Sequence, residues 1–203
     1  MVALVSRTGR HLQRYNQGRR QVVGCIPYRY RVASLGEEKK LEVLVISSQK
    51  KGKGMLFPKG GWESDESIRE AALRETEEEA GVLGNLEVGF HLYILLPMLT
   101  DILNVCTFWF WQRMLGRWYF KSKNQDTCYE GYMFPLLVEE QLEFWPEKDF
   151  RQRIWMSVTE AKESCQHLWM KEALDVFVRR LGSTKQKIKE AEVVGPCSSC
   201  TLS

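Results

Sequence analysis

Three glutamates with helical spacing are the part of this sequence best suited to chemistry. Glu75, Glu78 and Glu79 stand at positions i, i+3 and i+4, so on a helix their carboxylates crowd one face. Like charges this close destabilise a helix unless cations neutralise them. Mg²⁺ and Mn²⁺ prefer carboxylate oxygens and bridge readily to phosphates, so the spacing predicts a divalent-cation site. The alternative, for a glutamate run taken alone, is a solvated acidic helix face.

A longer pattern around these glutamates disfavours the solvated-face alternative. Gly60 is followed after five residues by Glu66, and Arg74 then begins the sequence RETEEEAGV, which ends at Val82. The whole segment, GGWESDESIREAALRETEEEAGV, resembles the Nudix box of pyrophosphohydrolases. Thr76 departs from that pattern, which usually has an aliphatic residue here, but a threonine fills much the same volume.

The resemblance implies metal-dependent hydrolysis of a phosphoanhydride bond without a covalent intermediate. Carried over position by position, the resemblance makes Glu78 the general base and adds Arg74 and Glu66 as catalytic residues. It makes Glu75 and Glu79 the ligands of Mg²⁺ or Mn²⁺. It also places the backbone of Gly60 and Gly61 against the metal or phosphates. The arginine would orient the glutamates through charge-assisted hydrogen bonds, and a Cβ at either glycine would hinder the backbone's approach.

Segments outside the box resemble a narrower group, the plant Nudix hydrolases related to diphosphoinositol polyphosphate phosphohydrolases. The resemblance rests on stretches such as SRTGRHLQRYNQGRRQVVGCIPYRY, YEGYMFPLLV and RQRIWMSVTEA. It implies a small-molecule polyphosphate substrate, either a diphosphoinositol polyphosphate or a nucleoside-diphosphate-linked compound such as a diadenosine polyphosphate. Such an anion needs cationic partners. The substrate-binding candidates are Arg19, Arg20, Lys59, Arg151 and Arg153.

A second functional interpretation is a regulatory protein with a Nudix fold that binds a polyphosphate or nucleotide but is catalytically impaired. Members of that kind typically lack part of the glutamate set. This chain keeps all four box glutamates, so the enzyme is the favoured interpretation.

The arrangement of strand and helix patterns predicts an α/β fold, and the resemblance implies an α/β/α sandwich with a mixed β-sheet between helices. Strands are expected at residues 21–31, 41–47, 118–121, 132–138 and 153–156. A helix is expected from about Asp65 to Ala80, with Gly81 as its C-terminal cap and Ile68, Ala72 and Thr76 on its inner side. Ser157 begins a capping-box pattern, and a later apolar stripe runs to Gly182.

An apolar segment, Val88–Gln112, interrupts the family pattern. Pro97 and Asp101 lie inside it, and a span there would split the sheet across a bilayer, so a transmembrane helix is disfavoured. We favour a translated, retained intron, because valine codons begin GU and glutamine can be CAG, which match the ends of an intron. Its exposed apolar surface would be an aggregation hazard.

The predicted organisation is a basic segment at residues 1–18, a Nudix domain at 19–182 and a flexible tail at 183–203. The net charge of +3 does not suggest a nucleic-acid partner. Cys200 begins a C-a-a-X motif, so it is a candidate for lipidation and peripheral membrane association. The six scattered cysteines favour a reducing compartment, hence cytoplasm or nucleus. The arginine-rich, acid-poor stretch before Glu37 leaves the mitochondrion or chloroplast as the alternative.

Overall fold

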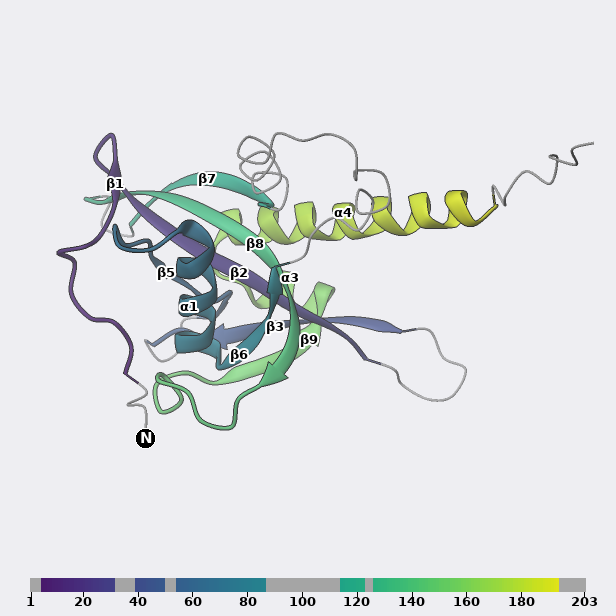
Figure 1. Cartoon of the computed structure of the whole chain (residues 1–203), viewed down its shortest axis with the longest axis horizontal. Coiled ribbons are helices and arrows are strands. Elements are labelled where there is room, and N and C mark those ends of the chain that lie inside the picture. The colour runs from purple at the N-terminus through teal and green to yellow at the C-terminus, as the bar shows by residue number, and fades with distance from the viewer. Residues whose placement is uncertain (1–4, 32–38, 50–53, 87–113, 123–125, 194–203) are drawn as a thin grey trace, which may run out of the picture.

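An open mixed sheet forms the centre of the protein. The computed structural model describes residues 5–31, 39–49, 54–86, 114–122 and 126–193, with side chains in the last range described to residue 183. Its strands are β1 (Tyr15–Asn16), β2 (Arg19–Arg31), β3 (Lys40–Ser47), β4 (Met55–Leu56), β5 (Lys59–Gly61), β6 (Val82–Leu86), β7 (Gly116–Lys121), β8 (Cys128–Gln141) and β9 (Arg153–Ser157). The helices are α1 (Ile68–Ala80), α3 (Val158–Ser164) and α4 (Leu168–Val193). Figure 1 shows the sheet running between α1 and α4.

The two longest strands, β2 and β8, pair in parallel at the middle of the sheet. The main path runs β4-β3-β2-β8-β6, and the other pairings are antiparallel, which makes the sheet mixed as predicted. The five strands expected from the sequence all form, although β8 is longer at both ends than the predicted segment 132–138.

Alternation along β2 sends side chains to both helix layers. Cys25 lies on one face, where its thiol contacts the main-chain carbonyl of Ala72 in α1. Tyr28 lies on the other face, where its ring centroid is 4.9 Å from that of Phe177 in α4. Both residues are fully buried, so the expected α/β/α sandwich is confirmed, with a core on each side of the sheet.

Local signals set both ends of α1. The Ser67 hydroxyl accepts a hydrogen bond from the amide of Glu70, and the Glu70 carboxylate accepts one from the amide of Ser67. This capping box begins the helix at Ile68, three residues later than the predicted Asp65. Gly81 caps the other end with a left-handed φ of 60°, as predicted. The predicted inner stripe is also confirmed, because Ile68, Ala72 and Thr76 are buried.

The C-terminal helices confirm one prediction and correct another. Ser157 caps α3 through a capping box with Glu160, as its pattern predicted. The predicted helix end at Gly182 is wrong, because α4 continues to Val193. Gly182 does not adopt a left-handed φ, and the Ser183 hydroxyl bonds the main-chain carbonyl of Arg179 one turn earlier. The predicted flexible tail therefore begins with helix.

The segment at residues 14–16, ahead of the predicted domain start at 19, packs against the domain. β1 pairs with β2, and the amide of Arg14 donates to the main-chain carbonyl of Trp62. No helix in the described ranges is long and apolar enough to cross a membrane. The predicted insertion at residues 88–112 lies outside the described residues, as does Cys200.

Candidate active site

The three glutamates of α1 are buried, so the solvated-face alternative is wrong for them. Their side chains are only 12% (Glu75), 12% (Glu78) and 8% (Glu79) exposed. Burial disfavours the charged carboxylate, and it raises the pKa of each of the three. For Glu75 the pKa rises to about 8, despite the opposing effect of Arg74. Three buried carboxylates with raised pKa values mark this end of α1 as a functional-site candidate.

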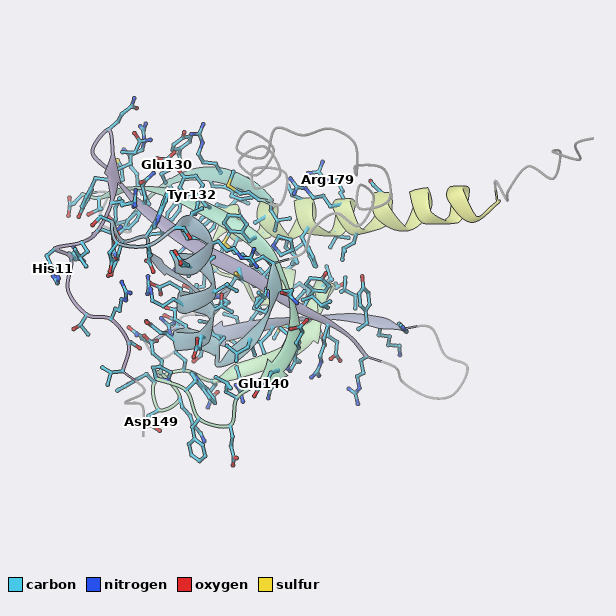
Figure 2. All side chains as sticks on the ribbon, in the orientation of Figure 1. His11, Glu130, Tyr132, Glu140, Asp149 and Arg179 are labelled. Atoms are coloured by element: carbon cyan, nitrogen blue, oxygen red, sulfur yellow. The ribbon has the colours of Figure 1, made fainter. Side chains whose placement is uncertain are left out.

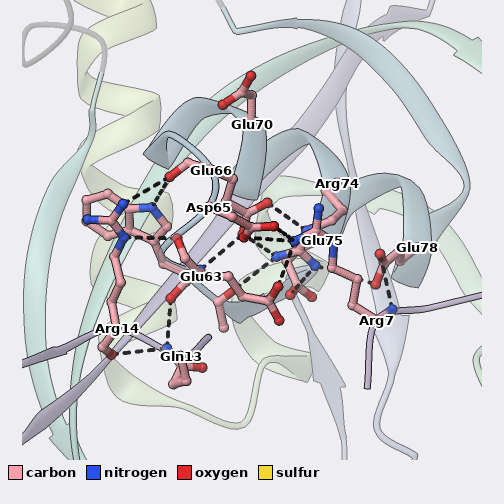
Figure 3. Close-up of polar contacts among 12 residues, drawn as sticks. Arg7, Gln13, Arg14, Glu63, Asp65, Glu66, Glu70, Arg74, Glu75 and Glu78 are labelled. Atoms are coloured by element: carbon pink, nitrogen blue, oxygen red, sulfur yellow. Dashed lines mark hydrogen bonds and ion pairs between the residues drawn. The ribbon is translucent and has the colours of Figure 1, made fainter. Parts of the chain in front are cut away.

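Arg74 lies at the centre of this cluster and contacts several of its members (Figure 3). Its guanidinium grips Glu66 with two hydrogen bonds, of 2.8 and 2.6 Å, and donates to Glu75 at 2.8 Å. A further N–H donates to the main-chain carbonyl of Gly61 at 2.9 Å, and Glu78 lies 3.6 Å away. This geometry is what an arginine that orients the glutamates requires. Burial opposes its charge, but the bond to Glu66 and the charge of Glu75 raise the pKa of Arg74 well above its usual value.

The carboxylate of Glu66 is bonded mainly to Arg74. Both of its carboxylate oxygens bond Arg74, and one also accepts from the amide of Glu63 at 3.1 Å. Its main-chain carbonyl accepts from the indole N–H of Trp62 and from Arg14. The structure therefore places Glu66 as the anchor of Arg74.

Glu79 meets partners from two distant segments. One of its oxygens accepts the amide of Lys59 at 2.8 Å, and the other is ion-paired with the guanidinium of Arg151. Arg151 also bonds the carboxylate of Glu147 at 2.5 Å and the main-chain carbonyl of Ser47 at 3.2 Å. Arg151, predicted to bind substrate, is thus in the site but is bonded within the protein.

Gly60 and Gly61 are needed for close packing around the glutamates. A Cβ on Gly60 would lie 1.9 Å from a carboxylate oxygen of Glu75. A Cβ on Gly61 would lie 2.1 Å from the side-chain oxygen of Gln13. In the structure the backbone of both glycines lies against protein side chains, and its predicted approach to a metal or phosphates stays a prediction.

The remaining predicted substrate-binding residues are divided between two places. Arg20 belongs to the site, because it bonds Gln13, which in turn donates to the carbonyl of Trp62. Arg19 is the preceding residue of β2, so its side chain points to the other face of the strand, where it bonds Gln17 and stacks over Tyr119. In Figure 2 the labels of Glu130 and Tyr132 mark the end of the sheet where β2 begins, whereas Glu140 and Asp149 lie toward the opposite end.

Arg153 does not reach the carboxylates of the glutamates. Its guanidinium donates to main-chain carbonyls at the end of α1, which was not expected from the sequence. The structure also adds participants that the sequence did not suggest. The amide of Arg7 lies 3.5 Å from Glu78, and Glu147 joins the cluster through Arg151. Arg7 is 71 positions from Glu78, so no spacing rule could have found it. Glu147 is only four positions from Arg151, but that pair reaches the cluster through the long-range contact between Arg151 and Glu79.

The donor set suits a hard divalent cation, because Glu75, Glu78 and Glu79 offer carboxylate oxygens, and burial raises the pKa of all three. The side chains are not preassembled for it. Over the described part of the chain, no three histidine, cysteine, aspartate or glutamate side chains are grouped so that they could hold a metal ion. Arg74 bonds one carboxylate oxygen of Glu75, and Arg151 pairs with one carboxylate oxygen of Glu79.

Comparison with known proteins agrees with the site. The model of the NUDIX domain matches residues 27–181. Nudix hydrolase 17, mitochondrial, and Nudix hydrolase 21, chloroplastic, both from Arabidopsis thaliana, are each 54% identical to this chain. The matches cover 96% and 91% of this chain, and 93% and 80% of the respective relatives.

More distant proteins share the domain as well. Diphosphoinositol polyphosphate phosphohydrolase 3-alpha of Mus musculus is 29% identical over 71% of this chain and 68% of its own length. A solved structure, a C. elegans Ap4A hydrolase binary complex, superposes with a TM-score of 0.52 at 18% identity, covering 80% of this chain and 98% of that one. Fold, box geometry and relatives together show that this chain belongs to the Nudix hydrolase family.

Proposed function

We propose that this Nudix hydrolase cleaves a phosphoanhydride bond in a diphosphoinositol polyphosphate or a nucleoside-diphosphate-linked polyphosphate, with Glu78 as general base. Hydrolysis of pyrophosphate bonds follows from the family; the substrate class and the roles of individual residues are the finer proposal. The observation that carries it is the buried cluster of Glu75, Glu78 and Glu79, held in place by Arg74.

Glu78 is the best placed of the three to accept a proton from water. Its neighbours Glu75 and Glu79 each bond an arginine closely, whereas the Glu78 carboxylate, among the residues that the structure describes, meets the amide of Arg7 at 3.5 Å and Arg74 at 3.6 Å. Burial raises its pKa, which brings a carboxylate closer to the range useful for a general base near neutral pH.

Glu75 and Glu79 would hold the divalent cation, Mg²⁺ or Mn²⁺. The bound ion would supply charge stabilisation at the phosphates and lower the pKa of water. The protein's own part is to keep both carboxylates in a buried position beside the backbone of β5, where Lys59 donates its amide to Glu79. Arg74 keeps Glu75 oriented through its 2.8 Å bond.

Cations near the cluster support a polyphosphate substrate. Arg20 and Lys59 lie on the two strands, β2 and β5, that pair beside the glycines. The mouse relative is named for diphosphoinositol polyphosphates, and the solved structure of similar fold is named for Ap4A. Both are anions with chains of phosphates, for which arginine and lysine are the matching side chains.

The first test is turnover by the purified full chain. With Mg²⁺ or Mn²⁺ it should release phosphate from a diphosphoinositol polyphosphate or cleave a diadenosine polyphosphate. Binding of either compound without turnover would support instead the regulatory alternative. Turnover of neither, with no binding, would remove the proposed substrate class.

The second test assigns the base. Glu78→Gln keeps the size of the side chain and should lower kcat by about a hundredfold or more, within the range assigned to general-base catalysis. Its matched control is Glu77→Gln at the preceding helix position. Glu77 lies outside the cluster, so this change should leave kcat unchanged. Hydrolysis by Glu78→Gln at the wild-type rate would refute the assignment.

We also propose an organelle as the compartment. The two plant relatives are named as mitochondrial and chloroplastic, and the comparisons do not support the cytoplasm or nucleus expected from the cysteines. A fluorescent protein fused to the C-terminus of the full chain would reveal the compartment. Prenylation of Cys200 stays a separate prediction, tested by whether Cys200→Ser changes membrane partitioning.

A further inference from the structure

Arg153 makes an unusual set of contacts for a residue predicted to bind phosphate. Its guanidinium donates to the main-chain carbonyls of Ala80 at 3.1 Å and Gly81 at 2.8 Å, and to that of Leu142 at 2.6 Å. The flat face of the same group stacks on the ring of Trp145, 3.9 Å from its centroid. One side chain on β9 therefore joins the C-terminal end of α1 to the loop between β8 and β9, residues 142–152.

The end of α1 needs such a partner. The last carbonyls of a helix have no partner within it and carry partial negative charge, which a nearby cation stabilises. No basic residue stands in the last turn of α1. Arg153 supplies the missing positive charge from another strand, and the turn that it stabilises is the one that carries Glu78 and Glu79.

The loop joined by Arg153 also reaches both of these glutamates. The amide of Glu147 donates to the main-chain carbonyl of Glu78 at 3.1 Å, and the amide of Leu142 donates to that of Gly81 at 2.8 Å. Arg151, in the same loop, pairs with the carboxylate of Glu79. A shift of the loop would therefore move Arg151 relative to Glu79 and loosen the main chain of Glu78.

The fit around Gly81 leaves little freedom for such a shift. A Cβ at this position would lie 2.6 Å from the ring of Trp145 and 2.8 Å from a guanidinium nitrogen of Arg153. Gly81, Trp145 and Arg153 therefore form a tightly packed joint between the helix and the loop.

We infer that Arg153 is a positioning residue for hydrolysis, which fixes the last turn of α1 and the residue 142–152 loop so that Glu78, Glu79 and Arg151 keep their relative places. This inference rests on the roles proposed for Glu78 and Glu79. It assigns Arg153 no contact with substrate, and so departs from the binding role expected from its charge.

The two roles differ in their kinetics. A positioning residue acts on the reacting geometry, and a displacement of about 1 Å can lower the rate about a hundredfold. Arg153→Met keeps a long side chain beside Trp145 but loses the guanidinium and all three of its hydrogen bonds. We expect kcat to fall roughly ten- to a hundredfold while KM stays within about threefold of wild type. A large rise in KM with kcat retained would overturn the inference in favour of substrate binding.

A matched control separates positioning from general stability. Arg29 also stacks on a tryptophan, 4.1 Å from the ring centroid of Trp155, and pairs with Glu42, but it lies away from the glutamates. Arg29→Met should leave kcat unchanged. Equal losses of kcat in Arg29→Met and Arg153→Met would overturn the inference. Arg153→Lys retains the charge and should recover part of kcat, without restoring it fully, because an ammonium cannot bond all three carbonyls in the same way.

Hydrogen exchange gives a readout that needs no substrate. In the metal-free protein, amides of residues 78–82 and 142–147 should exchange faster in Arg153→Met than in wild type, and Arg29→Met should not change them. Unchanged exchange in these segments would overturn the inference even if activity fell. If wild type turns over none of the tested polyphosphates, the proposed substrate class fails, while the exchange comparison still decides the role of Arg153.

Discussion

The ion pair between Arg151 and Glu79 allows a quantitative prediction for the metal-free protein. Both side chains are nearly buried, at 7% and 8% exposure. Arg151→Met keeps most of the volume but removes the ion pair that, together with the nearby charge of Lys59, compensates Glu79. Removing one partner of a buried pair costs about 3–5 kcal/mol. For a protein of this size each kcal/mol lowers Tm by about 2–4 °C, so Tm should fall by about 6–20 °C.

Urea denaturation in the presence of a chelator measures this loss directly. A double-mutant cycle with Glu79→Gln tests its cause, because Arg151→Met should cost less once Glu79 carries no charge. The expected coupling is at least about 1 kcal/mol, within the range for residues in contact. A loss below about 1 kcal/mol for Arg151→Met, or the same loss in both backgrounds, would refute the reasoning.

Divalent cations supply an independent check on the same pair. If Glu79 is a metal ligand, Mg²⁺ should stabilise Arg151→Met more than wild type, because in wild type the ion competes with the guanidinium. Equal stabilisation of the two proteins would mean that Arg151 and the metal do not compete for Glu79.

Three further predictions use other features of the fold. Gly60→Ala should lower kcat at least tenfold, because its Cβ would lie 1.9 Å from a carboxylate oxygen of Glu75; wild-type kinetics would contradict this. Gly182→Ala should raise the free energy of unfolding by about 0.5–1 kcal/mol, because this glycine lies inside α4 with open space around it. A loss of stability by denaturation would mean that the helix ends there. The metal-free protein should become less stable as pH rises from about 4.5 to about 8, because burial raises the pKa of Glu75 to about 8, so the folded state binds more protons than the unfolded one. Denaturation midpoints that rise between pH 4.5 and 8 would contradict this prediction, and so would a fall in Glu75→Gln as large as that in the wild type.

The catalytic helix was largely predictable because its signals are local. Gly81 must follow the last turn in a left-handed conformation, and the buried stripe of Ile68, Ala72 and Thr76 repeats at helical spacing. The start was placed too early because Asp65 and Ser67 are both good caps. The reciprocal bonds between Ser67 and Glu70 decide between them in favour of Ser67.

The far end of α4 shows the limit of the same reasoning. Glycine at the end of an apolar stripe usually marks a helix end, but Gly182 stays helical and the chain continues to Val193. A glycine can occupy either conformation at small cost, so its presence alone does not determine which one is adopted.

Long-range partners were not predictable from spacing. Positive charge and a place at the strand ends and box that the related family uses made Arg151 and Arg153 candidates for substrate binding. In the structure the first pairs with Glu79 and the second bonds the carbonyls that end α1. More than 70 residues separate each arginine from the part of α1 that it contacts. Only the return of β9 beside β3 brings them back to the helix, and that depends on the topology of the whole sheet.

The degree to which arginines offset the charges of Glu75 and Glu79 affects the order in which metal and substrate bind. Arg74 and Arg151 already bond Glu75 and Glu79, yet burial still raises the pKa of both carboxylates, so the two arginines do not fully offset the cost of their charges. Above about pH 8, where Glu75 is ionised as well, a polyphosphate approaching this cluster without additional cations would meet further negative charge and be repelled. Substrate should therefore bind weakly to the chelated protein, and productive binding should require the divalent cation to arrive before the polyphosphate or together with it.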